Sequence, residues 1–88
     1  MRVTLYGKAD CCLCHQAMDV IKRAGRDYPL TIEEVDITTD PALYEKYRYT
    51  IPVVAIDGVE ALVSKVSEVW LRRALREAGA RERPGGAR

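Results

Sequence analysis

Three cysteines lie within four residues of this chain, at positions 11, 12 and 14. An apolar run over residues 3–6 and then Gly7 precede them, and a pattern typical of a helix follows directly. A disulfide between such close neighbours closes a very small loop and constrains the unfolded chain little, so a structural cross-link explains the cluster poorly. A Cys-x-x-Cys pair between a strand and a helix instead indicates thiols that are oxidised and reduced.

The composition is that of an ordinary small globular domain. Of the 88 residues, 48% are hydrophobic and 31% are charged, and the net charge is +1, a balance that favours neither a nucleic acid nor an anionic membrane as partner. No apolar run approaches the roughly 20 residues of a membrane helix, and the amino-terminal segment lacks the apolar core of a signal peptide. We therefore expect one cytoplasmic domain, a monomer with no membrane or nucleic-acid partner.

The segment after the cysteines carries a helical stripe. Its apolar residues recur at positions 13, 17, 20, 21 and 24, and a glycine at position 25 follows where a helix can end. At about 100° per residue, Cys11 and Cys14 lie one turn apart on the same side, whereas Cys12 falls on the polar face. The spacing therefore predicts that Cys11 and Cys14 are the working pair.

Further strands and helices follow along the chain. A strand over residues 30–37 has irregular alternation, which predicts a bulge or a later start. Asp40 and Pro41 are typical of an N-cap and a first helical residue. Residues 53–56 are continuously apolar, as in a strand that is buried on both faces.

A hairpin and a helix complete the pattern. The dipeptide Asp57-Gly58 is a two-residue hairpin signal, and a last helix opens near Ser67. The order is therefore βαβαββα, an α/β fold with a four-stranded mixed sheet and helices on both faces. We expect this domain to cover residues 1–79, and residues 80–88, which lack apolar anchors, to form a disordered tail.

The start of the first helix predicts different roles for the cysteines. A thiol attacks a disulfide only as the thiolate, which a helix N-terminus stabilises through its unpaired N–H groups and its dipole. Cys11 is placed there; Lys8 would add a positive charge, and Asp10 would oppose it unless it caps the helix. Cys14, one turn deeper, is expected to resolve the mixed disulfide that Cys11 forms with a substrate. Cys12 is expected to point into solvent as a spectator or a modifiable thiol.

A metal site is an alternative use of the same side chains. His15 follows the three cysteines, and cysteine and histidine are both zinc ligands. One helical turn cannot wrap four ligands around an ion, and the sequence offers no second, separated pair, so we predict no metal site within the chain. Two other roles stay open: a metal or iron–sulfur carrier that shares the cysteines between two chains, and a non-catalytic module that binds a partner protein.

A second feature lies at Thr50-Ile51-Pro52-Val53. Because proline cannot donate a hydrogen bond to a sheet, Pro52 at the head of an apolar run marks the start of a strand. One interpretation is a proline that does only this. The other is a cis Ile51–Pro52 bond that turns the backbone of residue 51 outward, so that the extended chain of a substrate can pair with it beside Cys11.

These motifs resemble those of a glutaredoxin, and more narrowly those of the small glutaredoxin-like proteins of bacteria. The matching segments are Leu5-Tyr6-Gly7-Lys8-x-x-Cys11-x-x-Cys14, Thr50-Ile51-Pro52-Val53 and Ile56-Asp57-Gly58. The resemblance implies a thioredoxin fold and a thiol–disulfide oxidoreductase that serves cell redox homeostasis, with Cys11 as nucleophile and Cys14 as resolving thiol. It further implies that Lys8, Ile51 and Pro52 lie near a bound glutathione or peptide, with Ile51–Pro52 cis.

The resemblance also sets expectations about partners. The substrates would be protein or small-molecule disulfides, the electron donor would be glutathione, as co-substrate, or a thioredoxin reductase, and no bound cofactor is implied. Two segments depart from the family pattern. Cys12-Leu13 stands where glutaredoxins usually carry Pro-Tyr, and Ala61-Leu62-Val63-Ser64-Lys65 replaces a glycine-bearing loop followed by an acidic residue. Leu62 and Val63 are therefore expected to obstruct glutathione.

Overall fold

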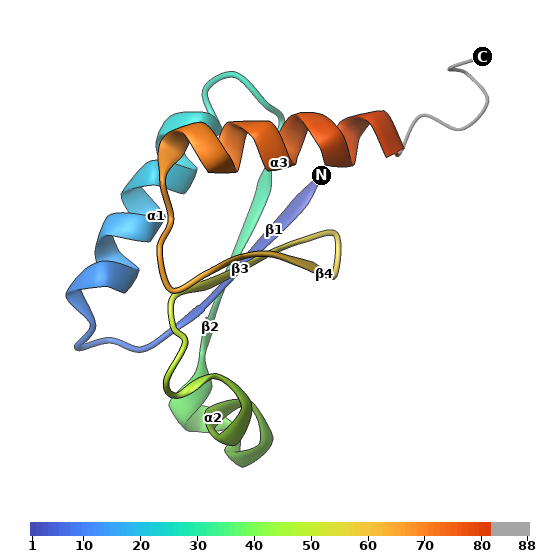
Figure 1. The fold of residues 1–88 in the computed structure, drawn as a ribbon. Helices are drawn as coiled ribbons and strands as arrows, with labels where there is room; N and C mark the ends of the chain where they lie inside the picture. The colour runs from blue at the N-terminus through green and yellow to red at the C-terminus, as the bar shows by residue number, and fades with distance from the viewer. Residues whose placement is uncertain (82–88) are drawn as a thin grey trace.

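The chain forms a four-stranded mixed sheet flanked by helices in the computed structural model, which describes residues 1–81 (Figure 1). The strands are β1 (Arg2–Gly7), β2 (Thr31–Asp36), β3 (Val53–Ile56) and β4 (Val59–Val63). The helices are α1 (Cys12–Ala24), α2 (Pro41–Tyr47) and α3 (Glu68–Arg81), and a short 3₁₀ helix, η1 (Ile37–Thr39), precedes α2. The order of the regular strands and helices is the predicted βαβαββα.

The strands lie side by side in the order β2-β1-β3-β4. β1 pairs in parallel with β2, which follows after α1, and antiparallel with β3. β3 and β4 form an antiparallel hairpin whose turn residues, Asp57 and Gly58, have φ angles of 52° and 86°. Positive φ at both central residues is the turn that the twist of a hairpin favours, which is why this dipeptide predicted it.

The two faces of the sheet carry separate apolar clusters, and the helices cover both faces (Figure 1). The larger cluster joins β1 and β3 to α1 and α3: Val3, Leu5, Ala17, Val20, Ile21, Ala24, Val54, Ile56, Leu71, Leu75 and Ala78. The smaller one gathers around α2: Ile37, Tyr47 and Val53, with Tyr6, Leu43 and Ile51 packed against it. Since neighbouring strand residues face opposite sides, β3 serves both clusters and is buried throughout, as predicted.

The irregularity of the sheet lies in another strand than the sequence suggests. β2 runs from Thr31 through the irregular segment, and its register with β1 is unbroken, so neither a bulge nor a start beyond that segment explains the irregular alternation. As an exposed edge strand, it has little need of strict alternation. The bulge is in β4: Val54 pairs with Leu62, but Ala55 pairs with Glu60, which leaves Ala61 as the extra residue.

α3 extends two residues past the predicted end of the domain at position 79, up to Arg81. A glycine inside a helix weakens it without removing a backbone donor, so Gly79 does not end α3. The rest of the predicted disordered tail, residues 82–88, lies outside the described residues. Within residues 1–81, no helix combines the length and the apolar character that crossing a bilayer requires.

Candidate active site

Cys11 is the N-cap of α1 and has extended backbone angles, φ −105° and ψ 111°. Its Sγ accepts a hydrogen bond from the backbone N–H of Cys14 at 3.3 Å, and its own N–H donates to the carbonyl of Lys8, also at 3.3 Å. Asp10, the other candidate for the cap, lies in the preceding turn. The first turn of α1 therefore directs one of its free N–H groups at the sulfur of Cys11.

The three thiols, all unbonded, differ in how far they reach solvent. Cys11 is half-buried, Cys12 is exposed, and Cys14 is 3% exposed, in agreement with the helical spacing. Leu13 is the exception to the predicted stripe, because its side chain is 56% exposed. Cys14 takes the inward position in this turn, and Leu13 lies about 100° away from it around the helix.

The environment of Cys14 keeps its thiol protonated at neutral pH. Burial and, to a smaller extent, the hydrogen bond with Cys11 raise the pKa of Cys14 to about 11, although the hydrogen bond with the backbone of Lys8 partly opposes the shift. The half-buried sulfur of Cys11 is thus the accessible member of the pair. Cys14 stands one turn behind it as a buried thiol.

Gly7 is a residue of this site whose role the sequence did not reveal. It is the last residue of β1 rather than part of a turn, and a Cβ atom built on it would lie 2.7 Å from Sγ of Cys14 and 3.0 Å from its Cβ. The backbone of β1 and the thiol of Cys14 therefore approach more closely than any side chain at position 7 would permit. No local sequence signal marks such an approach, since it depends on how α1 packs on β1.

Pro52 lies across a groove from the first turns of α1. The Ile51–Pro52 bond is cis, as the resemblance predicts, and the carbonyl of Pro52 accepts a hydrogen bond from Ser64 N–H at 2.8 Å. The groove, called the Pro52 groove below, has a volume of about 350 Å³ and is lined by Leu13, Gln16, Ala17, Pro52, Ser64, Lys65, Val66 and Ser67. Its lining joins apolar side chains to a single charged one, Lys65.

Ile51 faces the protein more than the sequence predicts. Its side chain packs against the smaller apolar cluster, and its N–H donates to the carbonyl of Tyr47 at 3.1 Å. Of the two backbone polar groups of Ile51 that were expected to face a substrate, the N–H is therefore already hydrogen-bonded within the protein. A contact of Ile51 with a substrate would have to use its carbonyl oxygen.

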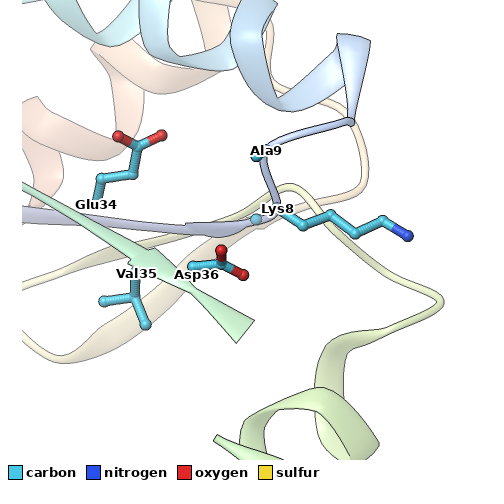
Figure 2. Close-up of a pocket in the computed structure, with 6 residues that line it drawn as sticks. Lys8, Ala9, Glu34, Val35 and Asp36 are labelled. Atoms are coloured by element: carbon cyan, nitrogen blue, oxygen red, sulfur yellow. The ribbon is translucent and has the colours of Figure 1, made fainter. Parts of the chain in front are cut away.

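Lys8 lines a different hollow, of about 230 Å³, together with Gly7, Ala9, Glu34, Val35 and Asp36. Figure 2 shows the side chain of Lys8 extending away from the carboxylates of Glu34 and Asp36. The side chain and backbone of Thr38 donate to Asp36 and lower the pKa of that carboxyl. The structure thus places Lys8 in the short loop between β1 and Cys11, but not among the residues that line the Pro52 groove.

The expected position of Leu62 and Val63 in the loop after the hairpin is wrong, because both residues belong to β4. Leu62 packs against the larger apolar cluster, and Val63 pairs with Val53. The loop that lines the Pro52 groove begins one residue later, at Ser64, which has φ 69°, a conformation that glycine adopts more easily. The end of β4 could not be placed from the sequence, because the bulge adds one residue to this strand.

Metal-binding groups do not assemble around the cysteines. Among residues 1–81, no three or more His, Cys, Asp and Glu side chains are grouped so that they could hold a metal ion. His15 is exposed on α1.

The fold and the site define a thioredoxin-fold protein with a Cys-x-x-Cys pair at the start of its first helix. The model of the glutaredoxin-like domain family (DUF836) matches residues 2–76. The chain belongs to this family, as the sequence motifs suggested.

Solved structures agree with this assignment. The X-ray structure of XcR50, a structural genomics target protein from X. campestris, is 33% identical, with a TM-score of 0.74 over 85% of this chain and 96% of that one. NrdH-redoxin from Escherichia coli is 26% identical, with a TM-score of 0.51 over 74% of this chain and 86% of its own. Reduced Escherichia coli glutaredoxin, 17% identical with a TM-score of 0.60 over 91% and 99% of the two chains, supports the fold alone.

Proposed function

We propose that the protein is a cytoplasmic thiol–disulfide oxidoreductase that uses Cys11 and Cys14 as its dithiol. The observation that carries this proposal is the capping geometry, in which the half-buried sulfur of Cys11 receives the N–H of the buried Cys14. A backbone donor at this position also stabilises negative charge on the sulfur during reaction. A pair of inert core cysteines would need neither the exposure of Cys11 nor this alignment.

The reaction consists of two exchanges. The thiolate of Cys11 attacks one sulfur of a substrate disulfide, which forms a mixed disulfide and releases the first substrate thiolate. Cys14 then loses its proton to solvent and attacks Sγ of Cys11, which forms the Cys11–Cys14 disulfide and releases the second substrate thiolate. Two electrons pass from the dithiol to the substrate, and a reduced dithiol protein or a pair of small thiols restores them.

The Pro52 groove is the proposed docking site for the chain around the substrate disulfide. It lies next to the first turn of α1, and Leu13, Ala17, Pro52 and Val66 give it an apolar lining. Apolar contact is more useful to an extended protein chain than to the small, charged glutathione molecule. The carbonyl of Ile51 is the proposed backbone contact for the substrate. Lys8, in the short loop before Cys11, would attract a carboxylate of the substrate.

A dithiol reductase is the proposed source of electrons. The resemblance to glutaredoxins implies two alternative electron donors, glutathione and a thioredoxin reductase. NrdH-redoxin, one of the structures that this chain resembles, is a glutaredoxin-like protein with a thioredoxin-like activity profile. That likeness and the apolar groove both support a thioredoxin reductase as the better donor.

Turnover of a small aromatic disulfide tests the proposal. The purified protein is assayed with glutathione plus glutathione reductase, and in parallel with thioredoxin reductase. Turnover should be faster with thioredoxin reductase, should be lost in Cys11→Ser, and should be retained in the matched control Cys12→Ser. If the folded wild-type protein reduces the disulfide with neither electron donor, or if Cys11→Ser is as active as wild type, the proposed oxidoreductase function is wrong. A non-catalytic binding module is then the better account.

A further inference from the structure

We propose that Gly7 is a positioning residue for the resolving thiol, because the absence of a side chain at this position sets how deeply Cys14 sits against the end of β1. The inference rests on the proposed function of the cysteine pair. It goes beyond that function by assigning a role to a residue that carries no reactive group.

The contact leaves no room for even one methyl group. A Cβ at position 7 would lie 2.7 Å from Sγ of Cys14, closer than real Cβ atoms come to a neighbouring heavy atom. Gly7 cannot retreat easily, because it pairs with Asp36 at the end of the parallel β1–β2 ladder. Cys14 has a short side chain on the first turn of α1, and its N–H is held by Sγ of Cys11. A side chain at position 7 must therefore push the start of α1 away from β1.

That displacement would act on the chemistry of the pair. Moving the first turn of α1 outward exposes Cys14, and desolvation by burial is the largest cause of its raised pKa. It would also disturb the hydrogen bond that Cys14 donates to Cys11. Gly7→Ala should thus make the thiol of Cys14 easier to ionise, an effect that a purely structural glycine would not have.

The test measures the reactivity of Cys14 alone. In a Cys11→Ser, Cys12→Ser background, the rate of alkylation is followed against pH, since the thiolate is the reacting form. Gly7→Ala should lower the pKa of Cys14 by at least about one unit, which makes alkylation near pH 8 roughly tenfold faster. The matched control is Gly79→Ala in α3, where a new Cβ would lie 3.5 Å from Cε of Met1, an ordinary contact. This control should leave the pH profile unchanged.

A second pair of variants covers the case in which Gly7→Ala prevents folding. Cys14→Ala removes the sulfur that the new Cβ would meet at 2.7 Å, so Gly7→Ala should be tolerated better in that background than in the presence of Cys14. An unchanged pH profile in folded Gly7→Ala, or an equal loss of stability with and without the sulfur, would overturn the inference. Neither measurement depends on turnover, so a failure of the proposed function would show only in the turnover assay with the small aromatic disulfide.

Discussion

The backbone N–H of Cys14 donates a hydrogen bond to Sγ of Cys11 at 3.3 Å, so the half-buried cysteine caps the helical turn that carries the buried one. Cys11 and Cys14 thereby gain different environments from a single helical turn. The accessible sulfur lies at the N-terminus of α1, and the buried sulfur keeps its proton at neutral pH because its pKa is about 11. This asymmetry supports the proposal that Cys11 attacks the substrate disulfide and that Cys14 resolves the mixed disulfide.

The resolving step should accelerate steeply with pH. Because burial raises the pKa of Cys14 to about 11, its thiolate fraction grows roughly tenfold per pH unit below that value. Release of a fluorescent thiol from a mixed disulfide preformed on Cys11, in a Cys12→Ser background, should therefore speed up about tenfold per unit between about pH 7 and pH 9. Stopped-flow fluorescence measures this rate. A rate that is flat over the range would contradict the buried, protonated state of Cys14.

Tyr47→Phe should destabilise the protein at neutral pH. The hydroxyl of Tyr47, whose side chain is nearly buried, donates to a carboxylate oxygen of Glu60 at 2.5 Å and so ties α2 to β4. Removing this donor should lower the free energy of unfolding by about 1 kcal/mol, as measured by urea titration. Tyr49→Phe is the control, because Tyr49 is 83% exposed. Equal stability of Tyr47→Phe and wild type would show that the hydrogen bond contributes nothing.

The penalty of Tyr47→Phe should fade in acid. Hydrogen bonding by Tyr47, and then the charge of Lys46, hold the pKa of Glu60 below its ordinary value of 4.5. A carboxyl with a lowered folded-state pKa contributes stability above the unfolded value, and this contribution is lost as the pH falls through the folded value. The difference between Tyr47→Phe and wild type should thus be constant near neutrality and shrink below pH 4.5. The same difference at neutral and strongly acidic pH would contradict this assignment.

Arg72→Gln should loosen the packing of α3 on α1. The guanidinium of Arg72 contacts Glu68 at 3.0 Å and Asp27 at 2.6 Å, and it donates to the carbonyl of Arg23 at 3.4 Å. The variant should have a lower melting temperature than wild type, and the difference should shrink in about 1 M salt, which screens exposed charges. Arg76→Gln, exposed on the same helix, should melt like wild type. A salt-independent deficit in Arg72→Gln would point to lost packing instead of lost charge.

The elements that could be predicted from the sequence are those with local causes. The stripe of α1, the cap at Asp40 and the hairpin at Asp57-Gly58 follow from helical periodicity and turn chemistry over a few residues. The exposure ranking of the three cysteines follows from the same periodicity. Their positions on one helical turn are enough to predict that Cys12 is exposed and that Cys14 is buried.

The features that could not be predicted depend on contacts between distant segments. The approach of Gly7 to Cys14 and the Pro52 groove arise only when α1, β1 and the loop after β4 pack together. The N–H of Ile51 is engaged by Tyr47, which no spacing rule in the sequence encodes. Lys8 likewise lines its own hollow, since the direction of a loop is not set by its residue types.

Trapping of the first intermediate tests most directly the claim that Cys11 attacks and Cys14 resolves. A Cys12→Ser, Cys14→Ser protein is mixed with a disulfide-bonded protein substrate, next to a matched Cys11→Ser, Cys12→Ser protein, and the covalent adducts are mapped by peptide mass spectrometry. We predict a stable one-to-one mixed disulfide on Cys11 in the first variant and little adduct in the second. Faster adduct formation through Cys14 in the second variant would contradict the account.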